Sequence, residues 1–145
     1  MKKTLDWIGL DWIEKTDGVS FYGYLNKDIV TDNNEYYRLL REAAIYINTN
    51  PQWASFQAPV EAMYFYTPII VSPNIEFTAT FGNDIENHCT FYSENNPEIL
   101  AKHVKQILTS KNYHALCEAA HSTVEHFTWD VVTDNFIRTL SRIIQ

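Results

Sequence analysis

The pattern of apolar and polar positions in the first half of the chain predicts strands that alternate with helices. Residues 18–25 alternate apolar with small or polar side chains and predict a strand, and the polar run 26–34 predicts a loop after it. Apolar residues then recur at helical spacing over 36–43, and the short apolar stretch 44–48 predicts a second strand. The order of elements in this part is therefore strand, helix, strand.

The middle of the chain continues the alternation. A helix is expected from about residue 56 to 65, and residues 68–72 have the continuous branched apolar character of a strand covered on both faces. A short strand over 88–92 follows. Strands that alternate with helices imply a parallel sheet with right-handed crossovers, so residues 45–48 and 69–72 are expected to be neighbouring central strands.

The last third of the chain has the pattern of three consecutive helices. Asn96 is a suitable N-cap and Pro97 suits the first helical position of the first helix. Ser110 and Thr128 are candidate N-caps of two further amphipathic helices. No strand is expected beyond Pro97. The first seventeen residues are ambiguous, because Leu5, Ile8, Trp12 and Ile13 could line a helix that Gly9 interrupts.

Composition and charge narrow the classes of function. A chain of 145 residues has the usual length of one domain, and a net charge of -7 argues against a nucleic-acid partner, which requires clustered Lys and Arg. Acidic residues interrupt every candidate signal peptide, and no apolar run is long enough for a transmembrane segment. Only two cysteines occur, so we expect a soluble, cytoplasmic protein without a disulfide framework.

Ligands of parallel α/β sheets bind at the carboxyl ends of the strands, where loops lead into helix N-termini. In this chain the segment to consider is 48–63, which follows a short strand and enters the helix that carries Glu61. Backbone N–H groups at such a helix start can bind an anion, and the helix dipole favours a diphosphate there. A solvated carboxylate without a ligand is the alternative interpretation of Glu61.

Six short motifs then follow one another in a familiar order. They are residues 18–25, 35–43, 58–63, 67–72, 96–101 and 125–129. Ala-Pro-Val-Glu-Ala-Met and Thr-Pro-Ile-Ile-Val-Ser, the third and fourth motifs, resemble the donor-site stretch of the large retaining group 1 family of GT-B glycosyltransferases. This family includes many lipopolysaccharide, capsule and glycan-assembly enzymes. The resemblance runs from about Gly18 to the end of the chain.

The resemblance implies a Rossmann-like α/β fold, with a parallel sheet, flanking helices and a helical C-terminus. Residues 1–145 would form a single domain, most of the C-terminal nucleotide-sugar-binding half of a GT-B enzyme, with the N-terminal acceptor domain missing. The implied reaction is retaining glycosyl transfer from a nucleoside-diphosphate sugar to a glycan or lipid-linked acceptor. It requires no cofactor and no obligatory metal. The isolated chain is expected to be inactive or nearly so.

The resemblance also assigns roles to residues, although it names no catalytic residue. Glu61 would bind the nucleotide ribose, and Trp53 either stacks on the donor or covers the edge of the core. The amides of the helix start would bind the diphosphate, and two residues after the first strand would flank the base. These two sets are Ser55, Phe56, Gln57 and Ala58, and Tyr24 with Leu25.

Several positions depart from the family pattern. The pattern has two Glu residues separated by seven positions; the second falls on Glu61, but the first falls on Trp53. The family's Gly-Phe-Gly is Ala-Ser-Phe at 54–56, and Tyr66 replaces a Gly before Thr-Pro. Ala79 stands where an acidic residue is common. These departures favour an alternative, a degenerate and non-catalytic interaction module whose contact surface is Trp53 with the aromatic cluster 64–66.

Three further expectations complete the picture. The final helix normally packs toward the other domain in this family, so Trp129, Phe136 and Ile144 are expected to be exposed and to drive weak self-association. The spacing of His114, His121 and His126 does not bring three metal ligands onto one helix face. A general nucleotide-binding or epimerase-like domain of the same architecture is a third hypothesis, which the Phe-Thr-Trp helix start disfavours.

Overall fold

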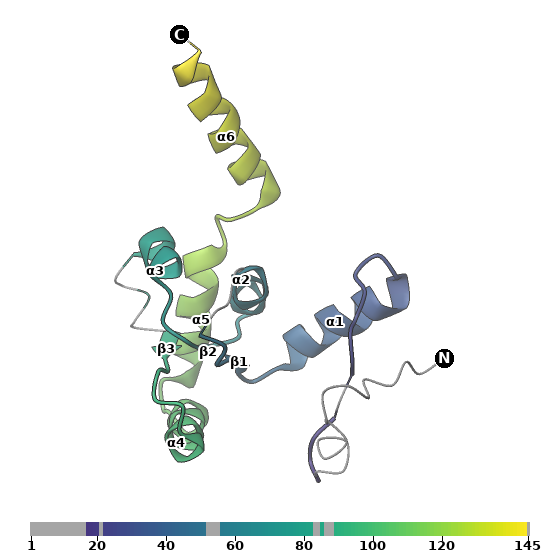
Figure 1. Ribbon diagram of the computed structural model, residues 1–145, viewed down its shortest axis with the longest axis vertical. Coiled ribbons are helices and arrows are strands. Elements are labelled where there is room, and N and C mark those ends of the chain that lie inside the picture. Colours follow the sequence, from purple (N-terminus) through teal and green to yellow (C-terminus); the bar gives the residue numbers. More distant parts are fainter. Residues whose placement is uncertain (1–16, 21, 52–55, 83–84, 86–88, 145) are drawn as a thin grey trace. The chain divides into compact units, whose positions relative to one another are not determined.

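The structure is a computed structural model that describes residues 17–20, 22–51, 56–82, 85 and 89–144 (Figure 1). The chain divides into two compact units, residues 1–37 and residues 38–145, and each unit is described by itself. The single domain expected over residues 1–145 stays a prediction. Among the described residues, no helix combines the length and the apolar character that crossing a membrane requires.

The described part of the first unit ends within α1 (Val30–Glu42). The strand expected over 18–25 is wrong for the described residues of that segment, which carry no strand. Gly18 and Gly23 have φ angles of 78° and 67°, which take the backbone out of the extended conformation at two points. The loop expected over 26–34 is also too long, because α1 begins at Val30. Asp32 in the first turn of α1 accepts a hydrogen bond of 3.2 Å from the backbone N–H of Asn26.

The second unit contains a parallel three-stranded sheet. Its strands are β1 (Tyr46–Asn48), β2 (Ile69–Val71) and β3 (Cys89–Phe91), in the order β1-β2-β3. The predicted pairing of 45–48 with 69–72 is therefore confirmed, and β2 is central as expected. The expectation that the first strand of this pair is also central is wrong for the described sheet, in which β1 lies at an edge. All three residues of β2 are fully buried, as expected of a strand covered on both faces.

Helices α2 (Gln57–Tyr64) and α4 (Pro97–Leu108) lie on opposite faces of this sheet (Figure 1). The unit also contains α3 (Ile75–Phe81), α5 (Tyr113–Val124) and α6 (Trp129–Ile143). Ile70 of β2 packs in a cluster with Ile107 of α4, while α2 contacts β1 and β2 and also packs on α5. Successive strand residues point to opposite faces. Ile47 and Ile70, which are in register, therefore face α4, and Tyr46 and Asn48 lie on the other face.

The three C-terminal helices are confirmed, and two of their predicted caps are correct. The side chain of Asn96 accepts from the N–H of Glu98, and that of Thr128 accepts from the N–H of Val131. The predicted cap at Ser110 is wrong, because Asn112 occupies the N-cap of α5. Helix α3 was not predicted, since its sequence is rich in β-branched residues that disfavour helices.

The apolar side chains of α6 are exposed, as expected from the sequence. Trp129, Phe136 and Ile144 have exposed fractions of 83%, 63% and 82%, and no described residue of α6 is buried. The self-association that this strip would drive stays a prediction. The described structure is thus a mixed α/β unit with a small parallel sheet, flanking helices and a helical C-terminus, which agrees with the coarse fold class expected from the sequence.

Candidate functional site

A polar pocket of about 350 Å³ opens at the carboxyl ends of the three parallel strands. Thr49 follows β1, Ser72 follows β2, and Tyr92 follows β3. The complete lining is Thr49, Pro51, Ser72, Pro73, Tyr92, Ser93 and Asn95. The lining therefore offers hydroxyl groups and one side-chain amide, and none of its side chains carries a charge.

Backbone hydrogen bonds hold the rim of the pocket in place. The N–H of Ser72 donates to the carbonyl of Asn48 at 3.0 Å, and the N–H of Tyr92 donates to the last carbonyl of β2 at 2.9 Å. The Asn48 side chain accepts from the N–H of Asn50 at 3.1 Å, which turns the chain away after β1. The sheet ladder thus extends one residue beyond β2 and β3 and fixes the pocket hydroxyls relative to one another.

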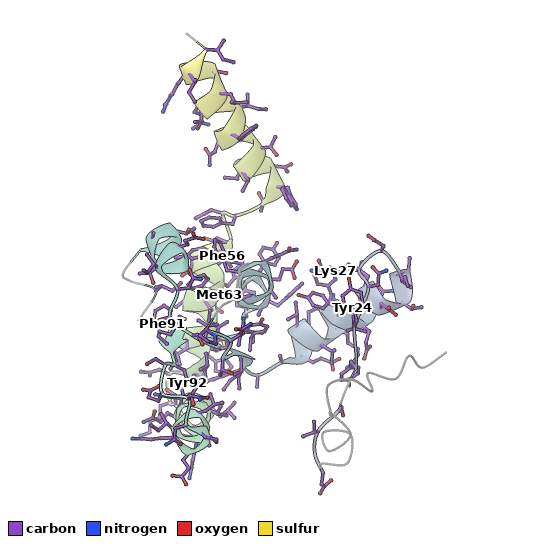
Figure 2. The ribbon with its side chains drawn as sticks, viewed as in Figure 1. Tyr24, Lys27, Phe56, Met63, Phe91 and Tyr92 are labelled. Atoms are coloured by element: carbon purple, nitrogen blue, oxygen red, sulfur yellow. The ribbon has the colours of Figure 1, made fainter. Side chains whose placement is uncertain are left out.

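The loop between β3 and α4 also contributes to the pocket lining, and it begins at Tyr92, which is labelled in Figure 2. The buried hydroxyl of Tyr92 accepts a hydrogen bond from the N–H of Asn96, whose side chain in turn caps α4 through the N–H of Glu98 at 2.9 Å. Between them, Asn95 has a φ angle of 47°, a left-handed conformation that Asn tolerates better than most residues. Both ends of this loop are therefore anchored.

Helix α2 begins beside the loop that leaves β1. Its N-cap, Phe56, makes no side-chain capping bond, and the Phe56 ring instead packs edge-on against Phe77 of α3 with 5.7 Å between the ring centroids. Pro59 has no N–H, so Gln57 and Ala58 carry the amide donors of the first three helical positions. The amides of Gln57 and Ala58 are two of the four that the family resemblance assigns to the diphosphate.

Glu61 lies one turn into α2 and is half-buried. Its Oε1 accepts a hydrogen bond from the side-chain amide of Gln57 at 2.9 Å. Burial, and secondly the negative charge of Glu61, raise the pKa of Tyr46 on β1 above its usual value of 10.0. The carboxylate of Glu61 therefore accepts a hydrogen bond within α2 and lies close enough to β1 for its charge to affect Tyr46.

The structure brings some of the predicted site residues together and leaves others undecided. Phe56, Gln57 and Ala58 share the start of α2 with Glu61. Trp53 and Ser55 lie outside the described residues. Tyr24 and Leu25 belong to the first unit, and Tyr24 is exposed there, so their role beside a base stays a prediction.

Sequence reasoning missed the residues that line the pocket itself. Thr49 lies in the segment 48–63 and Ser72 ends the motif 67–72, but neither of them was assigned a role from the sequence, and Ser93 lies outside the six motifs. Their position within two residues of the end of a strand was the available signal, because parallel strands in register bring such residues to one edge.

His121 and the two cysteines make contacts within the second unit or are buried in it. His121 stacks on Tyr66 with 4.0 Å between the ring centroids, and its Nδ1 lies 2.7 Å from the carbonyl oxygen of Tyr64, to which it can donate a hydrogen bond. Cys89 and Cys117 are both buried, and no disulfide joins them. In the described ranges of the chain, no group of three His, Cys, Asp or Glu side chains could hold a metal ion.

The candidate site therefore has two described parts. One is the polar pocket at the carboxyl ends of the strands, and the other is the start of α2 with Glu61, whose charge acts on Tyr46 of β1. This arrangement can bind a ligand that carries hydroxyl groups and a negative charge, through neutral donors rather than a cationic cluster. Comparisons of the chain with protein-family models, with curated proteins and with solved structures found no match.

Proposed function

We propose that the second unit is the donor-binding part of a retaining GT-B glycosyltransferase with a Rossmann-like sheet. It would hold a nucleoside-diphosphate sugar against the carboxyl ends of its strands. The observation that carries the proposal is the polar pocket at this edge, because open parallel α/β sheets bind ligands outside the carboxyl ends of their strands. The order of six family-like motifs along the chain supports the choice of a nucleotide sugar.

The pocket lining suits the hydroxyl-rich part of such a ligand. The hydroxyls of Thr49, Ser72 and Ser93 can each donate and accept hydrogen bonds, and the Asn95 amide adds two donors and an acceptor. The diphosphate would lie against the amides of Gln57 and Ala58, where the dipole of α2 favours negative charge. Binding here would depend on oriented amides and not on basic side chains.

Glu61 would accept hydrogen bonds from the ribose hydroxyls. In the structure its Oε1 already accepts from Gln57, so a ribose would either displace this amide or use the second carboxylate oxygen. Stabilisation of the leaving diphosphate by amides and the helix dipole would then assist glycosyl transfer without an obligatory metal. A separate acceptor domain would complete the enzyme, so the chain alone would bind a donor without turning it over.

The test is a calorimetric titration of the chain with common UDP- and GDP-sugars. We expect weak binding, and we expect Glu61→Gln to weaken it by about tenfold to a hundredfold, or roughly 1.5–3 kcal/mol, because a charged acceptor is lost. Asn95→Gly keeps the left-handed backbone and removes the pocket amide, so it should weaken binding by about twofold to tenfold.

Glu118→Gln on α5 is the matched control, since Glu118 is an exposed carboxylate outside the pocket lining. It should leave the affinity unchanged. Binding that Glu61→Gln and Asn95→Gly both leave unchanged would remove the strand ends and α2 from the site. If the wild-type chain binds no nucleotide sugar, the interaction-module alternative becomes the better account.

One observation favours that alternative specifically. Tyr64 and Tyr66 expose 47% and 45% of their surface, and both rings contact His121 of α5, the Tyr66 ring by parallel stacking. A half-exposed aromatic pair on a rigid helix end is typical of protein contact surfaces. If the chain binds no nucleotide sugar, and Tyr64→Ala abolishes its binding to a partner protein, the result would support the interaction-module alternative.

A further inference from the structure

The outer edge of β1 has backbone groups that the described sheet does not use. The N–H of Tyr46 bonds to the carbonyl of Pro68 and the N–H of Ser72 bonds to the carbonyl of Asn48, both at 3.0 Å. In a strand the backbone groups of alternate residues point to opposite edges. Because Tyr46 and Asn48 face β2, the N–H and C=O of Ile47 face outward. Within the described ranges, no strand pairs with this edge.

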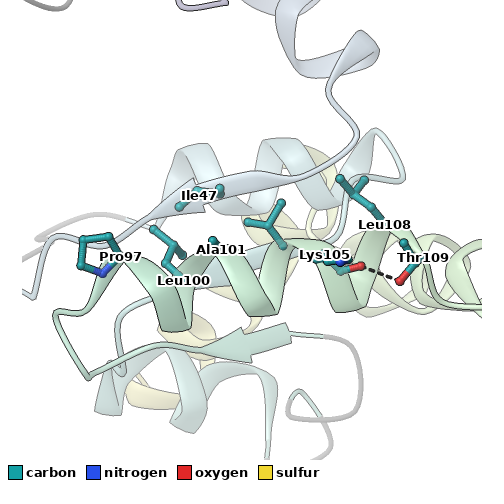
Figure 3. Close-up of a pocket in the computed structure, with 8 residues that line it drawn as sticks. Ile47, Pro97, Leu100, Ala101, Lys105, Leu108 and Thr109 are labelled. Carbon is teal, nitrogen blue, oxygen red and sulfur yellow. Dashed lines mark hydrogen bonds between the residues drawn. The ribbon is translucent and has the colours of Figure 1, made fainter.

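An apolar groove lies directly beside the same residue. The Ile47 side chain, 43% exposed, forms one wall of a groove of about 480 Å³, and α4 forms the other (Figure 3). The residues of α4 and its C-cap that line the groove are Pro97, Leu100, Ala101, Val104, Lys105, Leu108 and Thr109. Lys105 is the one charged side chain in this lining. A strand added at the edge of β1 would therefore also cover apolar surface on α4.

The edge also lacks the features that usually prevent pairing. Natural edge strands are commonly blocked by charged residues, Pro or bulges. The segment 44–49, Ala-Ile-Tyr-Ile-Asn-Thr, contains no charged residue, no Pro and no Gly, and most of its residues favour strands. A strand edge of this kind is suited to pairing with another strand.

We propose that β1 pairs with β1 of a second copy of this chain, antiparallel and across a twofold axis at Ile47. The argument for a second copy is self-complementarity. The outward N–H and C=O of Ile47 can exchange both hydrogen bonds with the same groups of Ile47 in the second copy, and Ile45 comes opposite Thr49 of that copy. The two three-stranded sheets then form one sheet of six strands.

The side chains fit the same symmetry. Directly opposed residues of an antiparallel pair lie on one face, so both Ile47 side chains point to the α4 face and the two grooves join. The two copies of α4 then run antiparallel. Glu98 in the first turn of one helix comes toward Lys105 in the last turn of the other, which places opposite charges together at both ends of the interface.

The experiment is sedimentation of the full chain, which has a mass of 16.9 kDa, over a range of concentrations. We expect a reversible dimer that Ile47→Lys weakens at least about tenfold, because two like charges would then be directly opposed. The amide of Ile47 should exchange with solvent more slowly as the concentration rises.

Ile75→Lys is the matched control, since Ile75 on α3 is 89% exposed and distant in sequence from β1. It should leave the dimer intact, and equal circular dichroism spectra of the two variants verify that Ile47→Lys folds. A dimer that Phe136→Lys on α6 abolishes and Ile47→Lys preserves would overturn the proposal. A chain that stays monomeric at high concentration, with the Ile47 amide in fast exchange, would overturn it as well. Neither result bears on nucleotide-sugar binding, so the two proposals are tested separately.

Discussion

At the C-terminus of α2, a glycine substitution should leave the protein more stable than an alanine substitution, which is the reverse of the usual order within helices. The N–H of Thr67 bonds to the carbonyl of Ala62 at 3.1 Å, and the N–H of Tyr66 bonds to that of Met63 at 3.0 Å, the two bonds of a Schellman motif. Tyr66 occupies the left-handed position of this motif, with a φ of 63°. Glycine is the usual residue there, because a side chain on Cβ crowds the backbone.

The magnitudes separate two substitutions at Tyr66. Tyr66→Ala keeps the left-handed strain of about 1 kcal/mol and loses the stacking on His121, which is worth about 0.5–1.5 kcal/mol. Tyr66→Gly loses the same stacking and also relieves the strain, so the two effects nearly cancel. We therefore expect the Gly variant to be about 1 kcal/mol more stable than the Ala variant. In ordinary helix or strand positions the order is the opposite, by about 0.5–1 kcal/mol.

Urea unfolding followed by circular dichroism measures this difference as a shift in midpoint between the two variants at constant slope. The same pair of substitutions made in a His121→Ala background separates strain from stacking. There the difference between Gly and Ala should persist while the cost of losing the Tyr66 ring shrinks. An Ala variant as stable as the Gly variant would refute the assignment of left-handed strain to Tyr66.

Two further predictions concern Thr67 and Tyr46, which also lie in the second unit. The hydroxyl of the buried Thr67 is shared between the carbonyls of Leu40 at 3.2 Å and Ala43 at 3.3 Å, so Thr67→Val should cost about 1–3 kcal/mol in urea unfolding and Thr67→Ser much less. The raised pKa of Tyr46 favours its neutral form in the folded state. That stabilisation is present below about pH 10 and lost as the pH rises through the raised pKa, and Glu61→Gln should lower this pKa in an NMR titration.

Local patterns were sufficient to predict the elements that depend on local interactions. The strand pair β1 and β2 follows from two short branched apolar runs, and the cap at Asn96 follows from a side chain that bonds the next turn. Helix α3 is different, because Thr78 and Thr80 lower its intrinsic propensity. Packing of Phe77 into the core, where it is fully buried, stabilises the helix instead.

In the candidate site, too, some features follow from local sequence and others depend on tertiary packing. Glu61 could be chosen from the sequence because it stands in a recognisable motif on a predicted helix. The hydrogen bond of Glu61 with Gln57 is a local i, i+4 contact within α2, whereas the proximity of Glu61 to Tyr46 depends on how α2 packs on β1, which the order of residues does not specify. The pocket hydroxyls of Thr49 and Ser72 likewise meet only after the strands are placed in register.

Three residues replace a glycine of the resembled family pattern, Ala54, Phe56 and Tyr66. The two that lie within the described residues, Phe56 and Tyr66, have different physical costs. Phe56 has φ and ψ angles of -100° and 20°, which a residue with a side chain adopts with little strain, and its ring gains contacts with Phe77 and Phe81. Tyr66 instead holds a left-handed conformation against the preference of its side chain. Since the Phe56 ring packs on α3, substitution there tests the aromatic cluster and the start of α2 together. At Tyr66 the comparison of the Gly variant with the Ala variant isolates the backbone cost, because both variants lose the same stacking on His121 and both Schellman hydrogen bonds can form with glycine in place of Tyr66.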